Sequence, residues 1–271
     1  MVELDLSEEH LTSLPELPSG LTYLCCVENY LTSLPQLPSC LTYLNCERNQ
    51  LTYLPELPSS LTYLNCEENQ LTYLPELPSS LTYLHCERNQ LTSLPDLPSS
   101  LTYLYCDENY LTYLPDSLPN SLTFLYCADN QLIKLPDVLP CCLTLLRCCG
   151  NRLTTLPENL PSSLTTLIFY SNHLIKLPKV PENCHIITQD NPWIWCSRIR
   201  DAEKIRLSMN KVAKVHILVC KYFARQLAVK VIQRNLENWL DKPVTADGKL
   251  GIRLRIGMRE MCGHTSLYPP V

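Results

Sequence analysis

Cysteine is the side chain best suited to chemistry in this chain of 271 residues, which contains 16 cysteines. A thiolate can act as a nucleophile, bind zinc or form a disulfide. Two patterns are present: adjacent pairs, such as Cys25 with Cys26 and Cys141 with Cys142, and a series spaced by 20 or 21 residues. The series consists of Cys26, Cys46, Cys66, Cys86, Cys106, Cys127 and Cys148.

Neither pattern predicts a reactive or metal-binding site. Adjacent residues on a strand point to opposite faces, so a Cys-Cys pair does not present two convergent ligands to zinc. Equivalent Cβ atoms on neighbouring parallel strands lie slightly too far apart for an unstrained disulfide. We therefore expect reduced thiols packed in a core. Since His85 has no nucleophile, base or orienting group beside it, we predict no catalytic, cofactor-binding or metal-binding residue.

The elements that position these cysteines come from a repeat of 20 residues, clearest between residues 41 and 100, of which LTYLNCEENQLTYLPELPSS is one copy. Counting from the first Leu, apolar residues occupy positions 1, 4, 6, 11, 14 and 17, Asn position 9, and Pro positions 15 and 18. Three copies of 21 residues follow, and degenerate copies at the two ends extend the series to about nine units over residues 1–184. Self-similarity at a fixed period is typical of a solenoid.

Each unit predicts one short strand and no helix. Positions 3 to 6 alternate, so we expect positions 4 and 6 to face the core and positions 3, 5 and 7 to face outward. The proline pair excludes helix from the second half of the unit and favours an extended, polyproline-like outer side. The Asn at position 9, for example Asn69, is predicted to satisfy backbone groups in the bend after the strand.

This repeat resembles the leucine-rich repeat family, with its pattern LxxLxLxxN/CxL, and in particular the short LPX type of bacterial type III effectors and of large DNA viruses. The resemblance covers about residues 1–195. It implies a curved parallel β-sheet with an extended convex side, and a role in protein-protein and host-pathogen interaction. The segment from Asn191 to Cys196, NPWIWC, is similar to the start of the C-terminal caps of such proteins, so residues 185–196 are predicted to be a cap.

The outward positions are rich in tyrosine and have an acidic edge. Tyrosine supplies contact area at a low entropy cost and is common at protein interfaces. The alternative is that the tyrosines only stabilise the sheet by stacking on one another. The predicted partner-binding residues are Tyr43, Tyr63, Tyr83, Tyr103, Glu47, Glu67, Glu87, His85, Tyr105 and Tyr126. The residues that replace Asn at position 5, which include Arg147, are expected to determine which partner binds.

Charge changes sign after the repeats. Residues 1–184 contain 20 acidic and 7 basic side chains, a net charge of −13, whereas residues 185–271 contain 7 acidic and 15 basic, a net charge of +8. Residues 197–240 lack Pro and Gly, which predicts that residues 197–271 form a basic, mainly helical region. Its helices are expected to pack on the end of the solenoid, or to contact a partner, an anionic membrane or a nucleic acid.

The leading functional hypothesis is a non-enzymatic scaffold that binds a protein with a basic surface through the strand face. The alternatives are a membrane- or nucleic-acid-associated protein acting through its basic helices, or a ubiquitin ligase, as some bacterial LPX proteins carry such a domain. Its Cys-x-Asp motif occurs here only at Cys127-Ala128-Asp129, inside the cysteine series. The first ten residues contain four carboxylates and no apolar signal region, which predicts a cytoplasmic protein, in the host cytoplasm if it comes from a pathogen or virus.

Overall fold

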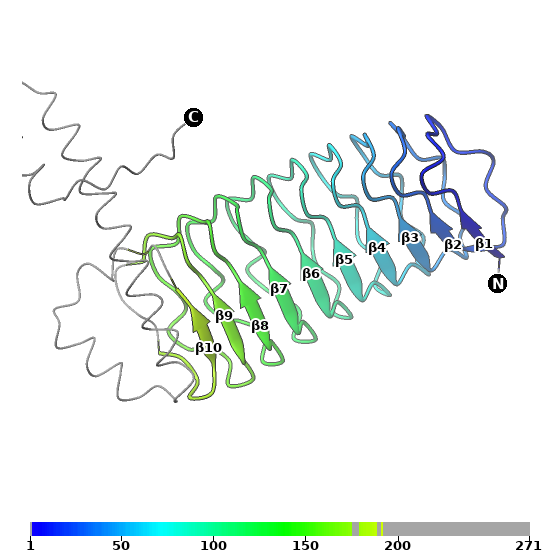
Figure 1. Ribbon diagram of the computed structural model, residues 1–271. Helices are drawn as coiled ribbons and strands as arrows, with labels where there is room; N and C mark the ends of the chain where they lie inside the picture. The colour runs from blue at the N-terminus through cyan, green and yellow to red at the C-terminus, as the bar shows by residue number, and fades with distance from the viewer. Residues whose placement is uncertain (1, 175–178, 189–190, 192–271) are drawn as a thin grey trace, which may run out of the picture. The chain divides into compact units, whose positions relative to one another are not determined.

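Each repeat contributes one strand, and the strands stack in chain order into a single parallel sheet (Figure 1). The computed structural model describes residues 2–174, 179–188 and 191. The strands are β1 (Val2–Asp5), β2 (Leu21–Cys25), β3 (Tyr43–Asn45), β4 (Tyr63–Asn65), β5 (Tyr83–His85), β6 (Tyr103–Tyr105), β7 (Phe124–Tyr126), β8 (Leu145–Arg147), β9 (Thr166–Ile168) and β10 (His185–Ile187). The predicted repeat solenoid is therefore confirmed.

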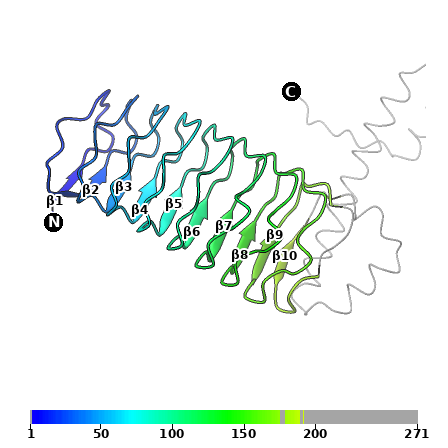
Figure 2. The ribbon, with the colours of Figure 1, turned by 180° about the vertical axis from the view of Figure 1, so that it is seen from behind.

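The register of the sheet preserves the repeat numbering. Tyr43 pairs with Tyr63 and Tyr63 with Tyr83, and the same one-to-one match continues along the sheet to β10. Both views of the ribbon show the strands side by side along the solenoid (Figures 1 and 2). A residue at a given position therefore lies next to the residue at the same position in the next repeat.

The structure describes only part of the C-terminal segments for which the sequence makes predictions. A tenth strand, β10, follows the nine units and lies in the segment 185–196 that the sequence assigns to a cap. The remainder of that segment, apart from Thr188 and the buried Asn191, and the whole basic region 197–271 lie outside the described residues. Within the described part of the chain, no helix has the length and hydrophobicity needed to cross a bilayer.

The core consists of leucine and cysteine rows that run through the repeats. Leu61, Leu64, Cys66 and Leu71 represent positions 1, 4, 6 and 11, and all four are fully buried. The residues described contain no helix between the strands, as the proline pair requires. Instead a tight turn leads into each strand from β2 to β10; in the turn before β4 the Leu61 N–H donates to the Pro58 carbonyl at 3.0 Å.

The regularly spaced cysteines are buried and unpaired, as predicted. All 13 cysteines among the described residues are free thiols. The Cys66 thiol donates to the carbonyl of His85 at 3.4 Å, so each row also links neighbouring strands. Burial raises the pKa of the Cys26 thiol to about 12 and holds the pKa of Cys66 well above its usual range. Thiols in this state are poor nucleophiles.

The asparagine row closes the bend after each strand. The amide of Asn69 donates to the carbonyl of Cys46 at 3.0 Å, and also to those of Cys66 and Glu67. Its carbonyl oxygen accepts the Leu51 N–H at 3.0 Å. Each carboxamide thus satisfies buried backbone groups of two successive repeats, which confirms the predicted structural role.

We expect Asn69→Leu to lower the free energy of unfolding by at least about 2 kcal/mol, because the buried Leu51 N–H loses its acceptor. Urea denaturation followed by circular dichroism measures this. Gln70→Leu, at the exposed neighbouring position, is the matched control and should change stability little. An Asn69→Leu variant as stable as the control would contradict the role given to the carboxamide.

We also expect iodoacetamide to label Cys40, Cys141 and Cys142 in the native protein, because these side chains are exposed. The buried row at position 6, exemplified by Cys46 and Cys66, should react only after unfolding. Peptide-resolved mass spectrometry before and after denaturation distinguishes the two groups. Rapid native labelling of the row would disprove its burial.

Candidate protein-binding face

We define the strand face as the surface formed by positions 3, 5 and 7 of the repeats, including the residues that follow each strand. The ten residues predicted to bind a partner all belong to it, and all are partly exposed. The face therefore brings the predicted tyrosines, glutamates and histidine together on one continuous sheet.

The tyrosines at position 3 form an ordered stack over the first repeats. Ring centroids lie 4.3 Å apart between Tyr23 and Tyr43, 4.2 Å between Tyr43 and Tyr63, and 4.4 Å between Tyr63 and Tyr83. The interplanar angles are 11°, 8° and 9°, so the rings are nearly parallel. Burial, assisted by the neighbouring phenols, raises the pKa of Tyr63 and brings that of Tyr23 to about 12. Since neighbouring rings cover each other's faces, a partner meets mainly their edges and hydroxyls.

The stack ends at Tyr83, where the aromatic surface becomes two columns wide. Tyr103 is tilted by 41° from Tyr83, at a centroid distance of 5.7 Å. A second aromatic column begins at position 5 of β6, where Tyr105 stacks on Tyr126 with a distance of 4.6 Å between ring centroids. Tyr105 also lies 5.5 Å from Tyr83, which joins the columns. The departures at position 5 therefore change the surface between β5 and β7.

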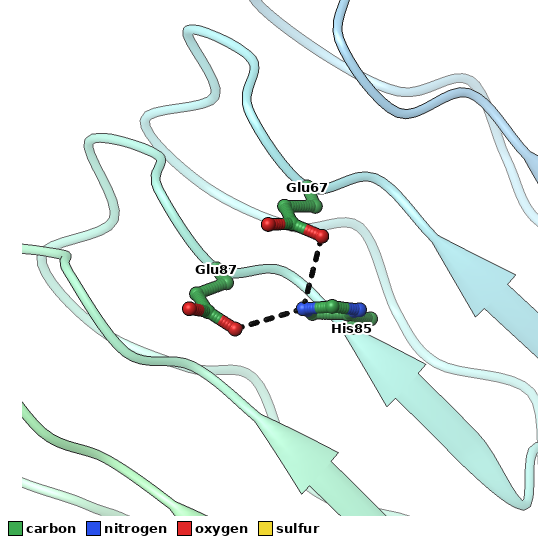
Figure 3. A group of neighbouring side chains, drawn as sticks. All are labelled: Glu67, His85 and Glu87. Carbon is green, nitrogen blue, oxygen red and sulfur yellow. Dashed lines mark hydrogen bonds and ion pairs between the residues drawn. The ribbon is translucent and has the colours of Figure 1, made fainter. Parts of the chain in front are cut away.

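His85 lies between two of the predicted glutamates (Figure 3). Its Nε2 atom is 2.9 Å from Oε2 of Glu87 and 3.3 Å from Oε2 of Glu67. Burial raises the pKa of the Glu67 carboxyl, whereas the hydrogen bond from His85 lowers the pKa of Glu87. The three side chains form one compact polar group, although the sequence analysis treats His85 as an isolated variation.

The preceding repeat has Asn65 in the place of His85. Asn65 donates to Glu47 Oε2 at 3.0 Å, and its own carbonyl oxygen accepts the Glu67 N–H at 3.0 Å. In both repeats the side chain at position 5 thus contacts the position-7 carboxylate of the preceding repeat.

The prediction that position 7 always faces outward is wrong for the later repeats. Asp107, Ala128 and Cys149 are buried there, with Asp107 only 1% exposed. The Asp107 carboxylate accepts the Ala128 N–H at 2.6 Å and forms an ion pair with Arg147, two repeats further along. Arg147, expected to help select a partner, is therefore engaged within the protein.

The edge beside the face carries alternating charges at position 8. Arg48 pairs with Glu28 and Glu68, and Arg88 pairs with Glu68 and Glu108. Each arginine thus bridges the repeats on either side. The alternation partly neutralises the acidic edge that the sequence predicts.

Sequence reasoning missed a second group of tyrosines outside the strands. They occupy positions 10 and 13 and are 44–55% exposed: Tyr30, Tyr53, Tyr73, Tyr110 and Tyr113. Their recurrence at fixed repeat positions could have identified them. The alternation of inward and outward side chains, however, predicts exposure only within strands.

The chain has close counterparts among solved structures, although no family model and no curated protein sequence matches it. YopM from Yersinia enterocolitica is 39% identical over 70% of this chain and 47% of that protein, with a TM-score of 0.64. The leucine-rich repeat domain of a Shigella effector is 31% identical over 64% of this chain and 70% of that domain, with a TM-score of 0.50. The chain belongs to the leucine-rich repeat family.

A third leucine-rich repeat protein shares a further feature. The functional domain of InlJ from Listeria monocytogenes is 31% identical over 70% of this chain and 46% of that one, with a TM-score of 0.53, and is described as including a cysteine ladder. These three proteins are all bacterial, as the resemblance to effectors suggests. This leucine-rich repeat protein spans about half the length of the Yersinia relative.

The raised tyrosine pKa values predict that the solenoid loses stability in alkali. The pKa of a phenol in the unfolded chain is near 10, whereas burial raises the pKa of Tyr105 in the folded chain to about 12. Between these values the unfolded state releases protons that the folded state retains, so stability falls as pH rises. Tyr63→Phe should make the fall between pH 8 and pH 11.5 shallower, as measured by urea denaturation. Tyr73→Phe, at an exposed position outside the face, is the control; identical profiles for wild type and Tyr63→Phe would contradict the prediction.

Proposed function

We propose that this leucine-rich repeat protein is a non-enzymatic scaffold that binds a protein partner through the strand face from β3 to β7. The observation that carries the proposal is the continuous tyrosine surface with glutamates along one side of it. The stacked rings are preorganised, so little side-chain entropy is lost on binding. Tyrosine edges and hydroxyls beside carboxylates suit a partner surface that combines apolar groups with hydrogen-bond donors.

The charge of the repeats favours a basic partner. Residues 1–184 have 13 more acidic than basic side chains, and Glu47, Glu67 and Glu87 lie directly on the face. Charges of opposite sign on a partner would speed association and make binding sensitive to salt. The Shigella relative is an effector, which supports a role in protein recognition.

We propose that the protein has no enzymatic activity that depends on a thiol nucleophile of the row at position 6, because these thiols are buried. Cys127, in the triplet Cys127-Ala128-Asp129 that matches a ubiquitin-ligase motif, is fully buried, and burial holds its pKa well above the usual range. A catalytic thiol requires access to substrate and a lowered pKa. We further propose a cytoplasmic location, because a reducing compartment is compatible with the rows of free thiols.

We expect Tyr63→Ala combined with Tyr83→Ala to weaken partner binding by at least about tenfold, because paired aromatic anchors contribute strongly to interfaces. Affinity capture from the native cell, with quantitative mass spectrometry, identifies the partner, and titration with the purified partner gives the dissociation constant. Tyr53→Ala combined with Tyr73→Ala is the matched control, since it removes two exposed tyrosines from outside the face. Both double variants must keep the wild-type circular dichroism spectrum.

The same capture separates the competing hypotheses. Binding that survives loss of Tyr63 and Tyr83 would contradict the strand-face hypothesis. Binding to phospholipid vesicles or to nucleic acid that requires residues 197–271 would instead favour the basic C-terminal region. That region lies outside the described residues.

A further inference from the structure

Three potential metal ligands converge between β4 and β5. One oxygen of Glu67, one of Glu87 and a ring nitrogen of His85 all lie within 4.8 Å of one another (Figure 3). Ligands that bind one zinc ion tetrahedrally at about 2.0 to 2.1 Å lie roughly 3.3 Å from each other. The distances from His85 Nε2 to Glu67 and Glu87, 3.3 and 2.9 Å, are close to this separation.

The group has an excess of negative charge in a partly buried place. The side chains of Glu67, His85 and Glu87 are only 16%, 16% and 17% exposed. Two carboxylates face one imidazole, so the acidic side chains outnumber the basic one. Arg88 lies 3.7 Å from the other Glu67 oxygen, Oε1, but its closer partners are Glu68 and Glu108. A divalent cation would neutralise the remaining charge.

The backbone holds the ligands at fixed spacing. His85 ends β5 and pairs in register with Asn65, which ends β4. Glu67 and Glu87 each follow two residues after these ends, at equivalent positions of adjacent repeats. Because equivalent residues in a parallel sheet keep their separation, little rearrangement is needed to bring the three ligands onto one ion.

We propose that Glu67, His85 and Glu87 bind a zinc ion, with the fourth coordination position open to water or to a side chain of a partner. Imidazole favours zinc over calcium and magnesium, which prefer oxygen ligands alone. One imidazole, two carboxylates and an open position fit the three-ligand form of zinc site. On binding, zinc takes the place of any proton on Nε2 and releases it to solvent. This proposal does not depend on partner binding.

The repeat itself supplies the matched variant. Asn occupies the place of His85 in the preceding repeat, between Glu47 and Glu67, so His85→Asn should fold normally. It should weaken zinc binding at this site at least about 100-fold, since one of three ligands is lost. His173→Asn, at an exposed position, should leave binding unchanged. Adding Asn65→His to the His85→Asn variant should restore binding, because the same ligand set is then built with Glu47 and Glu67.

The test is calorimetric titration of the full-length chain with zinc chloride, together with absorption spectra of the cobalt(II)-substituted protein. Cobalt at this site should show d–d bands, and these bands should disappear in His85→Asn. The spectrum should lack thiolate-to-cobalt charge-transfer bands, which distinguishes this site from cobalt bound to exposed cysteines. Recovery of these bands when Asn65→His is added would support the proposal. Equal zinc affinity in wild type and His85→Asn, or a wild-type spectrum due to thiolate ligation alone, would overturn it.

Discussion

In-register stacking is the constraint on which the rest of the structure depends, because it places every side chain against the same position of the next repeat, about 4.8 Å away. A row of leucine or free cysteine meets this condition by packing, and a row of tyrosine meets it by stacking. A row of like charges does not, because the charges repel. At position 8 the repulsion is relieved by alternating glutamate with arginine, as at Glu68 and Arg88. At position 7 it is relieved by a polar side chain at position 5, since Asn65 donates to Glu47 and His85 contacts both Glu67 and Glu87.

The same constraint explains how much the sequence could predict. A period of 20 residues with alternation at positions 3 to 6 determines the strand, the buried positions and the asparagine bend, since all of these are properties of one unit and its neighbour. The burial of Asp107 could not be derived in this way, because its ion-pair partner Arg147 lies 40 residues along the chain. Nor does periodicity indicate that the tyrosines would cover one another's faces, since that depends on ring rotation within the row.

Positions 5 and 7 change together along the solenoid. In two repeats where position 7 is glutamate, the side chain at position 5 forms a hydrogen bond to a glutamate carboxylate, as Asn65 does to Glu47 and His85 to Glu87. Where position 7 is buried, position 5 is aromatic in two repeats, at Tyr105 and Tyr126, and is Arg147 in the repeat of Cys149. The departures to tyrosine at position 5 and to a buried side chain at position 7 thus begin in the same repeat, at Tyr105 and Asp107. Duplication alone would produce uniform rows, so these departures mark the part of the sheet where the surface has diverged.

This divergence gives the strand face two chemically different halves. From β3 to β5 a single tyrosine column runs beside glutamates, whereas from β6 to β7 two aromatic columns run side by side and the carboxylate of Asp107 is buried. A partner bound in the proposed mode would therefore place its basic groups over β3 to β5 and its apolar groups over β6 to β7. The group formed by Glu67, His85 and Glu87 lies at the boundary between the halves, where charge and aromatic surface meet.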